Sequence, residues 1–191
     1  RLQLVACGSD LALHRQHLRL PAAADRQLGV VAVEMPVGGF GAPDLAGAAN
    51  DLRAQHGQPP LAYDELRPMA GAGARGMVGR AFGLTPSDPG YPALRDAFLS
   101  LYQLRLLRLS SVFDEVPPLL ARIEASGRPW GVVTNKATHL ADPLLQGLQL
   151  RHRAAVLVGG DTTPHTKPHP APLLHAAREL GVQAPRCVYV G

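Results

Sequence analysis

Strand candidates alternate with helix candidates through the second half of the chain, and this alternation limits the possible folds more than any other feature. Short apolar runs predict strands at residues 130–133, 154–158 and 187–190. The segments before and between them have helical periodicity: 114–126, 136–148 and 170–180. Strands and helices that alternate in this way form a parallel sheet with right-handed crossovers. We therefore predict an α/β fold in which the three strands are parallel neighbours.

The middle of the chain follows a different pattern, because residues 43–109 contain helix candidates and loops without a strand candidate. The predicted helices cover residues 45–56, 64–69, 74–82 and 92–108. A long helical insertion of this kind does not fit the alternating scheme of the sheet. We therefore predict that residues 43–109 form a separate helical cap.

The predicted domain organisation has three parts. Residues 1–42 are an atypical N-terminal part of the core, with a β-branched apolar strand predicted at 30–33. Residues 1–28 show no clean period, so neither helix nor loop is favoured there. The helical cap at 43–109 follows, and residues 110–191 form the rest of the core, which is expected to be truncated at its C-terminus.

Composition and charge argue against several classes of protein. The formal net charge is +4, but the basic residues are scattered and only 5% of residues are aromatic, so we expect no nucleic-acid partner. No apolar run approaches the roughly 18 residues of a membrane span, so no membrane partner is expected. Cys7 and Cys187 do not make a disulfide framework, and Cys187 is predicted to be a small buried residue. A reducing cytoplasm is the expected location, and the oligomeric state is left open.

A polar tip follows the strand predicted at 130–133. Its residues are Thr134, Asn135 and Lys136, which supply a hydroxyl, an amide and an ammonium group. In an open α/β sheet, the crevice outside the carboxyl ends of the strands is where ligands bind. A hydroxyl, backbone N–H groups and a positive charge together suit a phosphate or a carboxylate. An ordinary strand with a polar loop after it is the alternative.

A second polar tip, residues 161–170, follows the strand predicted at 154–158 and therefore lies at the same sheet edge. Lys167 stands there between a loop and a helix that begins with proline. From this position Lys167 could reach Thr134 and neutralise a dianion, as lysines do when they stabilise a transferring phosphoryl group. A lysine that only caps the loop is the alternative.

Arg75 is a candidate ligand for the far end of a substrate. Residues 71–75 join two predicted helices through glycines that allow the backbone to approach a ligand. Arg75, near a helix start, could therefore reach the distal part of a bound molecule. A solvated helix arginine is the alternative.

These motifs, in this order, resemble the haloacid dehalogenase superfamily and, within it, the phosphoglycolate phosphatase group. The matching segments are Val132-Val133-Thr134-Asn135-Lys136, Gly159-Gly160-Asp161, Lys167-Pro168-His169-Pro170-Ala171-Pro172-Leu173 and Tyr189-Val190-Gly191. Residues 73–78 and 130–136 are also similar to N-acetylmuramic acid 6-phosphate phosphatases. The likeness covers roughly residues 42–191.

The resemblance implies a Rossmann-like parallel sheet core with an inserted helical cap, and hydrolysis of a small phosphomonoester through an aspartyl-phosphate with Mg²⁺. It implies catalytic roles for Thr134, whose hydroxyl bonds the phosphoryl group, and for Lys167, which pairs with the phosphate and the nucleophilic aspartate. The expected partner is a small phosphorylated metabolite. The residues expected to bind it are Thr134, Asn135, Lys136, Lys167 and Arg75.

The chain departs from the family at its first motif, a strand followed by Asp-x-Asp-Gly-Thr, which should fall near residues 33–37. Val33 replaces the nucleophile and Met35 replaces the general acid. Glu34 lies between them, but a one-residue offset on a strand points a side chain to the opposite face. No metal ligand is identified, because Asp161 alone would leave most of the Mg²⁺ ligands to water.

A second departure is that the chain stops at Gly191, before the family's fourth motif, an Asp pair that follows Tyr-Val-Gly. An aspartyl-phosphate mechanism needs a carboxylate nucleophile, and Mg²⁺ needs hard oxygen ligands. Three explanations stay open: a fragment with a garbled or frame-shifted start, a degenerate pseudoenzyme, and a phosphoester-binding or interaction module that keeps only the phosphate cradle. We expect no turnover from the chain as written, although an intact parent would be a phosphatase.

Overall fold

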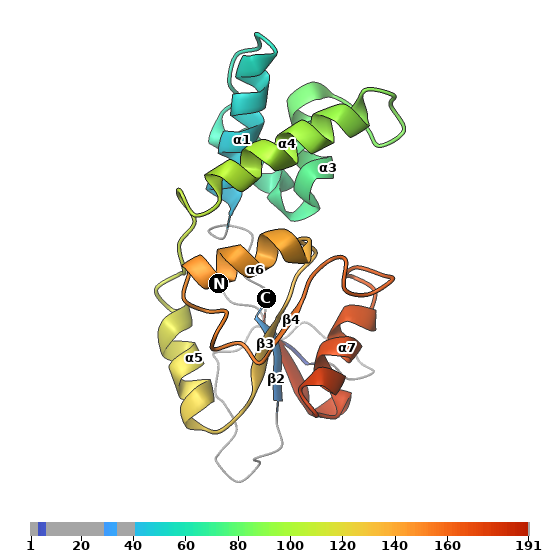
Figure 1. Ribbon diagram of the computed structural model, residues 1–191. Helices are drawn as coiled ribbons and strands as arrows, with labels where there is room; N and C mark the ends of the chain where they lie inside the picture. The colour runs from blue at the N-terminus through green and yellow to red at the C-terminus, as the bar shows by residue number, and fades with distance from the viewer. Residues whose placement is uncertain (1–3, 7–28, 34–40, 191) are drawn as a thin grey trace. The chain divides into compact units, whose positions relative to one another are not determined.

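The computed structural model describes residues 4–6, 29–33 and 41–190 of the 191-residue chain. The chain divides into two compact units, which Figure 1 shows as a sheet flanked by helices and a separate group of helices. The core unit comprises residues 1–36 and 113–191, and the helical unit comprises residues 37–112. Within the described part of the chain, no helix has both the length and the apolar character needed to cross a membrane.

The core unit contains a five-stranded sheet in the order β1-β5-β2-β3-β4. Its strands are β1 (Leu4–Ala6), β2 (Gly29–Val33), β3 (Trp130–Val133), β4 (Val156–Val158) and β5 (Cys187–Val190). The last four run parallel, and β1, which the sequence did not predict, is an antiparallel edge strand beside β5. The predicted α/β fold with a parallel sheet is therefore confirmed.

One part of the predicted topology is wrong, because the three later strands are not all neighbours. β3 pairs with β4, but β2 lies between β3 and β5. The chain therefore moves outward from β2 to β3 and β4, and then returns to the other side of β2 to form β5. The strand order reverses at β2 and β5, and such a reversal marks the place where ligands bind in open α/β sheets.

Among the described residues, three helices cover the sheet: α5 (Val116–Ala125), α6 (Thr138–Gly147) and α7 (Ala171–Glu179). Figure 1 shows α5 and α6 on one side of the sheet and α7 on the other. Right-handed crossovers explain this, because the connection from β3 to β4 and the connection from β4 to β5 run in opposite directions across the sheet. Helix α6 begins two residues later than predicted, since Ala137 has an extended backbone. Lys136 and Ala137 therefore belong to the loop after β3.

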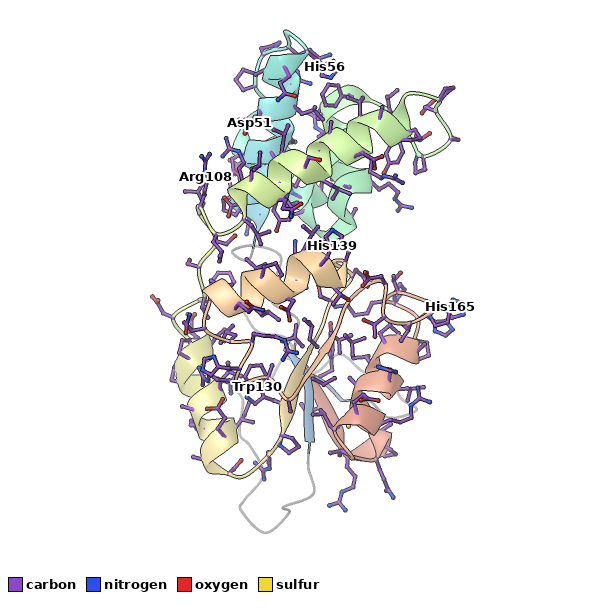
Figure 2. The ribbon with its side chains drawn as sticks, viewed as in Figure 1. Asp51, His56, Arg108, Trp130, His139 and His165 are labelled. Carbon is purple, nitrogen blue, oxygen red and sulfur yellow. The ribbon has the colours of Figure 1, made fainter. Side chains whose placement is uncertain are left out.

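The core forms where α7 packs on the sheet. Every residue of β3 is buried, and a side chain at Gly131 would place its Cβ 2.8 Å from the Val156 carbonyl oxygen on β4. Cys187 is buried in the core, as predicted. At the start of β3, beside α5, the Trp130 indole donates to the Glu124 carboxylate (3.0 Å; Figure 2). Glu124 also pairs with Arg153.

The helical unit consists of α1 (Ala42–Gln55), α2 (Tyr63–Leu66), the 3₁₀ helix η1 (Arg67–Ala72), α3 (Gly73–Phe82) and α4 (Tyr91–Arg105). Its described residues, 41–112, contain no strand. Phe98 and Tyr102 of α4 are buried, and Arg105 pairs with Asp51 of α1. Residues 71–75, predicted to join two helices, contain the junction at which η1 ends and α3 begins, at Gly73. That this unit acts as a cap stays a prediction.

A buried carboxylate ties the two ends of the helical unit together. Asp44, in the first turn of α1, has no exposed surface. It accepts hydrogen bonds from the backbone N–H groups of Leu109 (3.1 Å) and Ser110 (3.0 Å), and from the Ser110 hydroxyl (2.6 Å). The segment that leaves α4 is therefore fastened to the start of α1.

Candidate active site

The candidate site begins where β3 ends. The Thr134 N–H donates to the Val158 carbonyl oxygen (2.9 Å), so the pairing of β3 with β4 continues to this residue. The Thr134 hydroxyl oxygen accepts a hydrogen bond from the N–H of Lys136 (3.1 Å). A threonine that bonds to the backbone two residues later turns the chain. Thr134 is thereby held half-buried at the carboxyl edge of the sheet.

Lys167 reaches the same edge from the loop between β4 and α7. Its ammonium Nζ donates to the Val133 carbonyl oxygen (3.1 Å) and to the Tyr189 phenol (3.3 Å). Val133 and Thr134 share one peptide group, so the ammonium lies beside the start of Thr134. The structure thus brings together the two loop tips that the sequence singled out. That Thr134 and Lys167 share one phosphate stays a prediction.

Asn135 holds the Lys167 loop against the tip of β3. Its amide Nδ2 donates to the Lys167 carbonyl oxygen (3.0 Å), and its Oδ1 accepts from the Lys167 N–H (2.9 Å). One side chain therefore binds both backbone groups of Lys167. This gives Asn135 a structural task that sequence analysis missed, since no local pattern shows which distant backbone an amide will bind.

Two glycines allow the two loops to lie close together. The Gly160 N–H donates to the Lys136 carbonyl oxygen (2.8 Å). A Cβ on Gly160 would lie 2.8 Å from the Asn135 carbonyl carbon, and a Cβ on Gly159 would lie 2.8 Å from the Thr138 nitrogen. Side chains at these positions would push the loops apart, so the glycine pair is required by the packing of the site.

Asp161 caps helix α6. Its carboxylate accepts hydrogen bonds from the Thr138 N–H (2.8 Å) and the Thr138 hydroxyl (2.5 Å). These hydrogen bonds lower the pKa of Asp161 below its ordinary value of 3.8. A negative charge at a helix N-terminus is favourable. The role of the Asp161 carboxylate in this structure is therefore to cap α6.

The remaining predicted residues are Lys136 and Arg75. Lys136 supplies its N–H to Thr134 and its carbonyl to Gly160, and its side chain is half-buried at the same edge. Arg75 lies in the helical unit, on the first turn of α3, where it is exposed. The substrate-binding roles of both side chains stay predictions.

The described residues contain no cluster of metal-ligating side chains. Nowhere in residues 4–6, 29–33 and 41–190 do three histidine, cysteine, aspartate or glutamate side chains come together as a metal site. His165 and His169 have ring centroids 4.1 Å apart, but the His169 Nδ1 accepts a bond from the Ala171 N–H. Figure 2 shows His165 on the outer side of its loop. Residues 34–37, with Glu34, lie outside the described residues.

Tyr189 is the residue of this site to which sequence analysis gave no role. It belongs to the Tyr189-Val190-Gly191 motif, but its phenol contacts Lys167 from a strand that lies two positions away from β3. The sequence did hold one signal for this residue. Alternate residues of a strand share a face, so Tyr189 lies on the same face of β5 as the buried Cys187.

Comparison with known proteins matches residues 32–191 to a family described as haloacid dehalogenase-like hydrolase. An N-acetylmuramic acid 6-phosphate phosphatase from Pseudomonas aeruginosa is 42% identical over 150 residues, which are 78% of this chain and 66% of that protein. A phosphoglycolate phosphatase from Xanthomonas campestris pv. campestris is 41% identical over 150 residues, 78% of this chain and 67% of that protein. The chain thus spans about two thirds of the length of these relatives.

Solved structures show the same fold at lower sequence identity. A crystal structure described as a "predicted phosphoglycolate phosphatase" from Haemophilus somnus 129pt has a TM-score of 0.71 and 24% identity. The match covers 84% of this chain and 74% of that chain. A match over residues 32–191 together with relatives above 40% identity identifies the family. This chain belongs to the haloacid dehalogenase-like hydrolases.

Proposed function

We propose that this chain binds a small phosphomonoester at the carboxyl edge of its sheet, as part of a phosphoglycolate phosphatase-like hydrolase. The observation that supports this most is the position of the Lys167 ammonium, which bonds to the Val133 carbonyl beside Thr134. A cation, a hydroxyl and backbone N–H groups at one sheet edge suit a dianionic phosphoryl group. The family membership and the names of the relatives favour the same chemistry.

Each side chain has a distinct role in this proposal. Lys167 neutralises the phosphoryl charge, and the Thr134 hydroxyl donates to a phosphoryl oxygen. Asn135 acts as a positioning residue, since its amide holds the Lys167 backbone. Lys136 adds positive charge at the same edge and is, with Lys167, one of only two lysines in the sequence. A local concentration of charge of this kind attracts an anionic substrate.

The names of the relatives indicate the substrate class. Phosphoglycolate and N-acetylmuramic acid 6-phosphate are phosphomonoesters that also carry a carboxylate. A site for such a molecule needs a second cation at a distance from the phosphate. Arg75 is our candidate, because it is exposed on the first turn of α3 and a guanidinium binds a carboxylate with two hydrogen bonds. Residues 43–109 would then act as the cap that supplies it.

For this sequence we propose binding without turnover. Val33 and Met35 stand where the family motif has its nucleophile and general acid, and no cluster of metal-ligating side chains lies among the described residues. Loss of a covalent nucleophile and its acid removes many orders of magnitude of rate. The second candidate function is a phosphoester-binding protein that is not part of any active hydrolase, and Val33 and Met35 favour it. The cytoplasm stays the expected location, on cysteine usage alone.

Calorimetric titration with inorganic phosphate tests the binding site. Lys167→Ala should weaken phosphate binding by about tenfold or more, because a charge-assisted hydrogen bond is lost. Arg122→Ala is the matched control, since it removes the same charge from an exposed position on α5. A similar loss in both variants would show a general charge effect and would contradict the proposed site.

An assay with phosphoglycolate and p-nitrophenyl phosphate, each with Mg²⁺, tests the absence of turnover. The purified chain should show no rate above background. A Mg²⁺-dependent rate that disappears in Lys167→Ala would contradict this part of the proposal. Glu34→Gln would then be the variant that identifies the nucleophile.

A further inference from the structure

The Tyr189 phenol lies at the candidate site without a role in the proposed function. Tyr189 packs partly buried against the core cluster that contains Val133 and Val158. Its phenol oxygen accepts a hydrogen bond from Lys167 Nζ (3.3 Å), and Nζ lies 5.7 Å from the ring centroid. A cation at this distance from an aromatic ring is attracted by it. The packed ring therefore offers the ammonium two kinds of contact.

The Lys167 ammonium contacts two strands that are not neighbours in the sheet. Lys167 Nζ also donates to the carbonyl of Val133, the last residue of β3. Because β2 separates β3 from β5, one ammonium contacts groups from both strands that flank β2. The ammonium therefore lies across the carboxyl end of β2, where the strand order reverses and open α/β sheets bind their ligands.

The backbone and the tip of Lys167 are held by different groups. Asn135 fixes the backbone, but four methylene groups separate it from Nζ, and a free lysine chain takes many conformations. The Val133 carbonyl and the Tyr189 phenol restrain the tip. A lysine that is already restrained loses less conformational entropy when it binds an anion, so its affinity is higher.

We infer that Tyr189 is a positioning residue that holds the Lys167 ammonium across the end of β2, where it meets the phosphoryl group. The inference rests on the proposed phosphate-binding role of Lys167. Tyr189 acts through Lys167, and it does not itself need to touch the phosphate. Removal of the phenol oxygen alone should therefore change both the state of the ammonium and the affinity for phosphate.

Tyr189→Phe removes only that oxygen and keeps the ring. Because Lys136 and Lys167 are the only lysines, protein labelled with ¹⁵N at the lysine ζ position gives two side-chain signals, which Lys136→Arg and Lys167→Arg assign. We expect Tyr189→Phe to shift or broaden the Lys167 ammonium signal, leave the Lys136 signal unchanged, and weaken inorganic phosphate binding by about tenfold. Tyr63→Phe, an exposed phenol on α2, is the matched control and should change neither.

An unchanged Lys167 signal in Tyr189→Phe would overturn the inference, and so would an unchanged affinity for phosphate. An equal loss of affinity in Tyr63→Phe would also overturn it, because the effect would not be specific to the site. Failure of the proposed function gives a different result: Lys167→Ala would then bind phosphate as well as the unchanged chain does.

Discussion

The two units of this molecule contain the same asparagine clamp and use it for different purposes. In the helical unit, the Asn50 amide donates to the Leu61 carbonyl (3.0 Å) and accepts from the Leu61 N–H (2.9 Å). In the core unit, Asn135 makes the same two bonds to the backbone of Lys167. Asn50 fastens an apolar residue in the loop after α1, whereas Asn135 fastens the residue whose ammonium reaches the end of β3. In both units the asparagine fixes the backbone of the residue it binds. The side chain of that bound residue, Leu61 or Lys167, decides whether the clamp serves stability or a binding site.

The sequence contains a single tryptophan, Trp130, so the stability of the two units can be followed separately. Fluorescence of Trp130 reports on the core unit, in which it is buried. Circular dichroism follows all helices, including those of the helical unit. A change that acts on one unit alone should therefore move only part of the unfolding signal.

The largest effect should come from Asp44→Ala in the helical unit. The substitution removes a buried carboxylate that accepts bonds from Leu109 and Ser110, and unsatisfied donors remain. We expect a loss of about 3 kcal/mol in the unfolding free energy of that unit, measured by urea titration with circular dichroism. Asp64→Ala, an exposed aspartate on α2, is the control. If the Trp130 transition moves as far as the helical one, the two units are not independent.

Gly160→Ala should have the next largest effect, and it should act on the core unit. Its Cβ would lie 2.8 Å from the Asn135 carbonyl carbon, so the loops must separate. We expect a loss of about 2 kcal/mol in the Trp130 transition together with weaker phosphate binding. In the helical unit, a Cβ at Gly79 of α3 would lie 3.5 Å from the Leu84 carbonyl oxygen, an ordinary contact. Gly79→Ala should therefore raise the unfolding free energy of that unit by up to about 1 kcal/mol. If Gly160→Ala and Gly79→Ala changed the unfolding free energy of their units in the same direction, the distinction between the two glycines would be contradicted.

Asn135→Ala and Asn50→Ala test the clamp comparison directly. Asn135 is exposed, so its removal should change the Trp130 transition by less than about 1 kcal/mol but weaken inorganic phosphate binding about tenfold. Asn50 is half-buried, and its removal should lower the stability of the helical unit by about 1 kcal/mol without a change in phosphate affinity. Calorimetry and urea titration measure the two effects. Loss of phosphate affinity in Asn50→Ala would show that the clamps do not differ in purpose.

The smallest effect should be the pH dependence from Asp161. Hydrogen bonds from Thr138 lower the pKa of this carboxyl below 3.8, so it contributes stability above its unfolded pKa and loses that contribution as pH falls through the folded pKa. Asp161→Asn keeps an acceptor for Thr138 but has no charge to lose. The stability difference between the unchanged chain and Asp161→Asn should therefore be constant near neutral pH and shrink as pH falls below about 4. Urea titrations at several pH values measure it, and a difference that grows with acid would contradict the assignment.

Local pattern was sufficient for most of the fold. The strands predicted at 130–133 and 187–190 form over those residues, and helices form at each predicted segment within a few residues. These elements depend on apolar runs, helical periodicity and nearby glycines or prolines, all of which act over short stretches of chain. The two polar loop tips were predictable for the same reason, since the ends of strands are visible in the sequence.

Tertiary structure alone decided what those elements contact. No run of residues indicates that β2 lies between β3 and β5, or that β1 pairs with β5, because strand order depends on which apolar faces pack together. The Asn135 clamp and the contact of Lys167 with Tyr189 join residues 32 and 22 positions apart, and each exists only because the sheet brings these residues to one edge. The sequence determined which groups could bind an anion, and the strand order determined that Lys167 meets Val133 and Tyr189 across the end of β2.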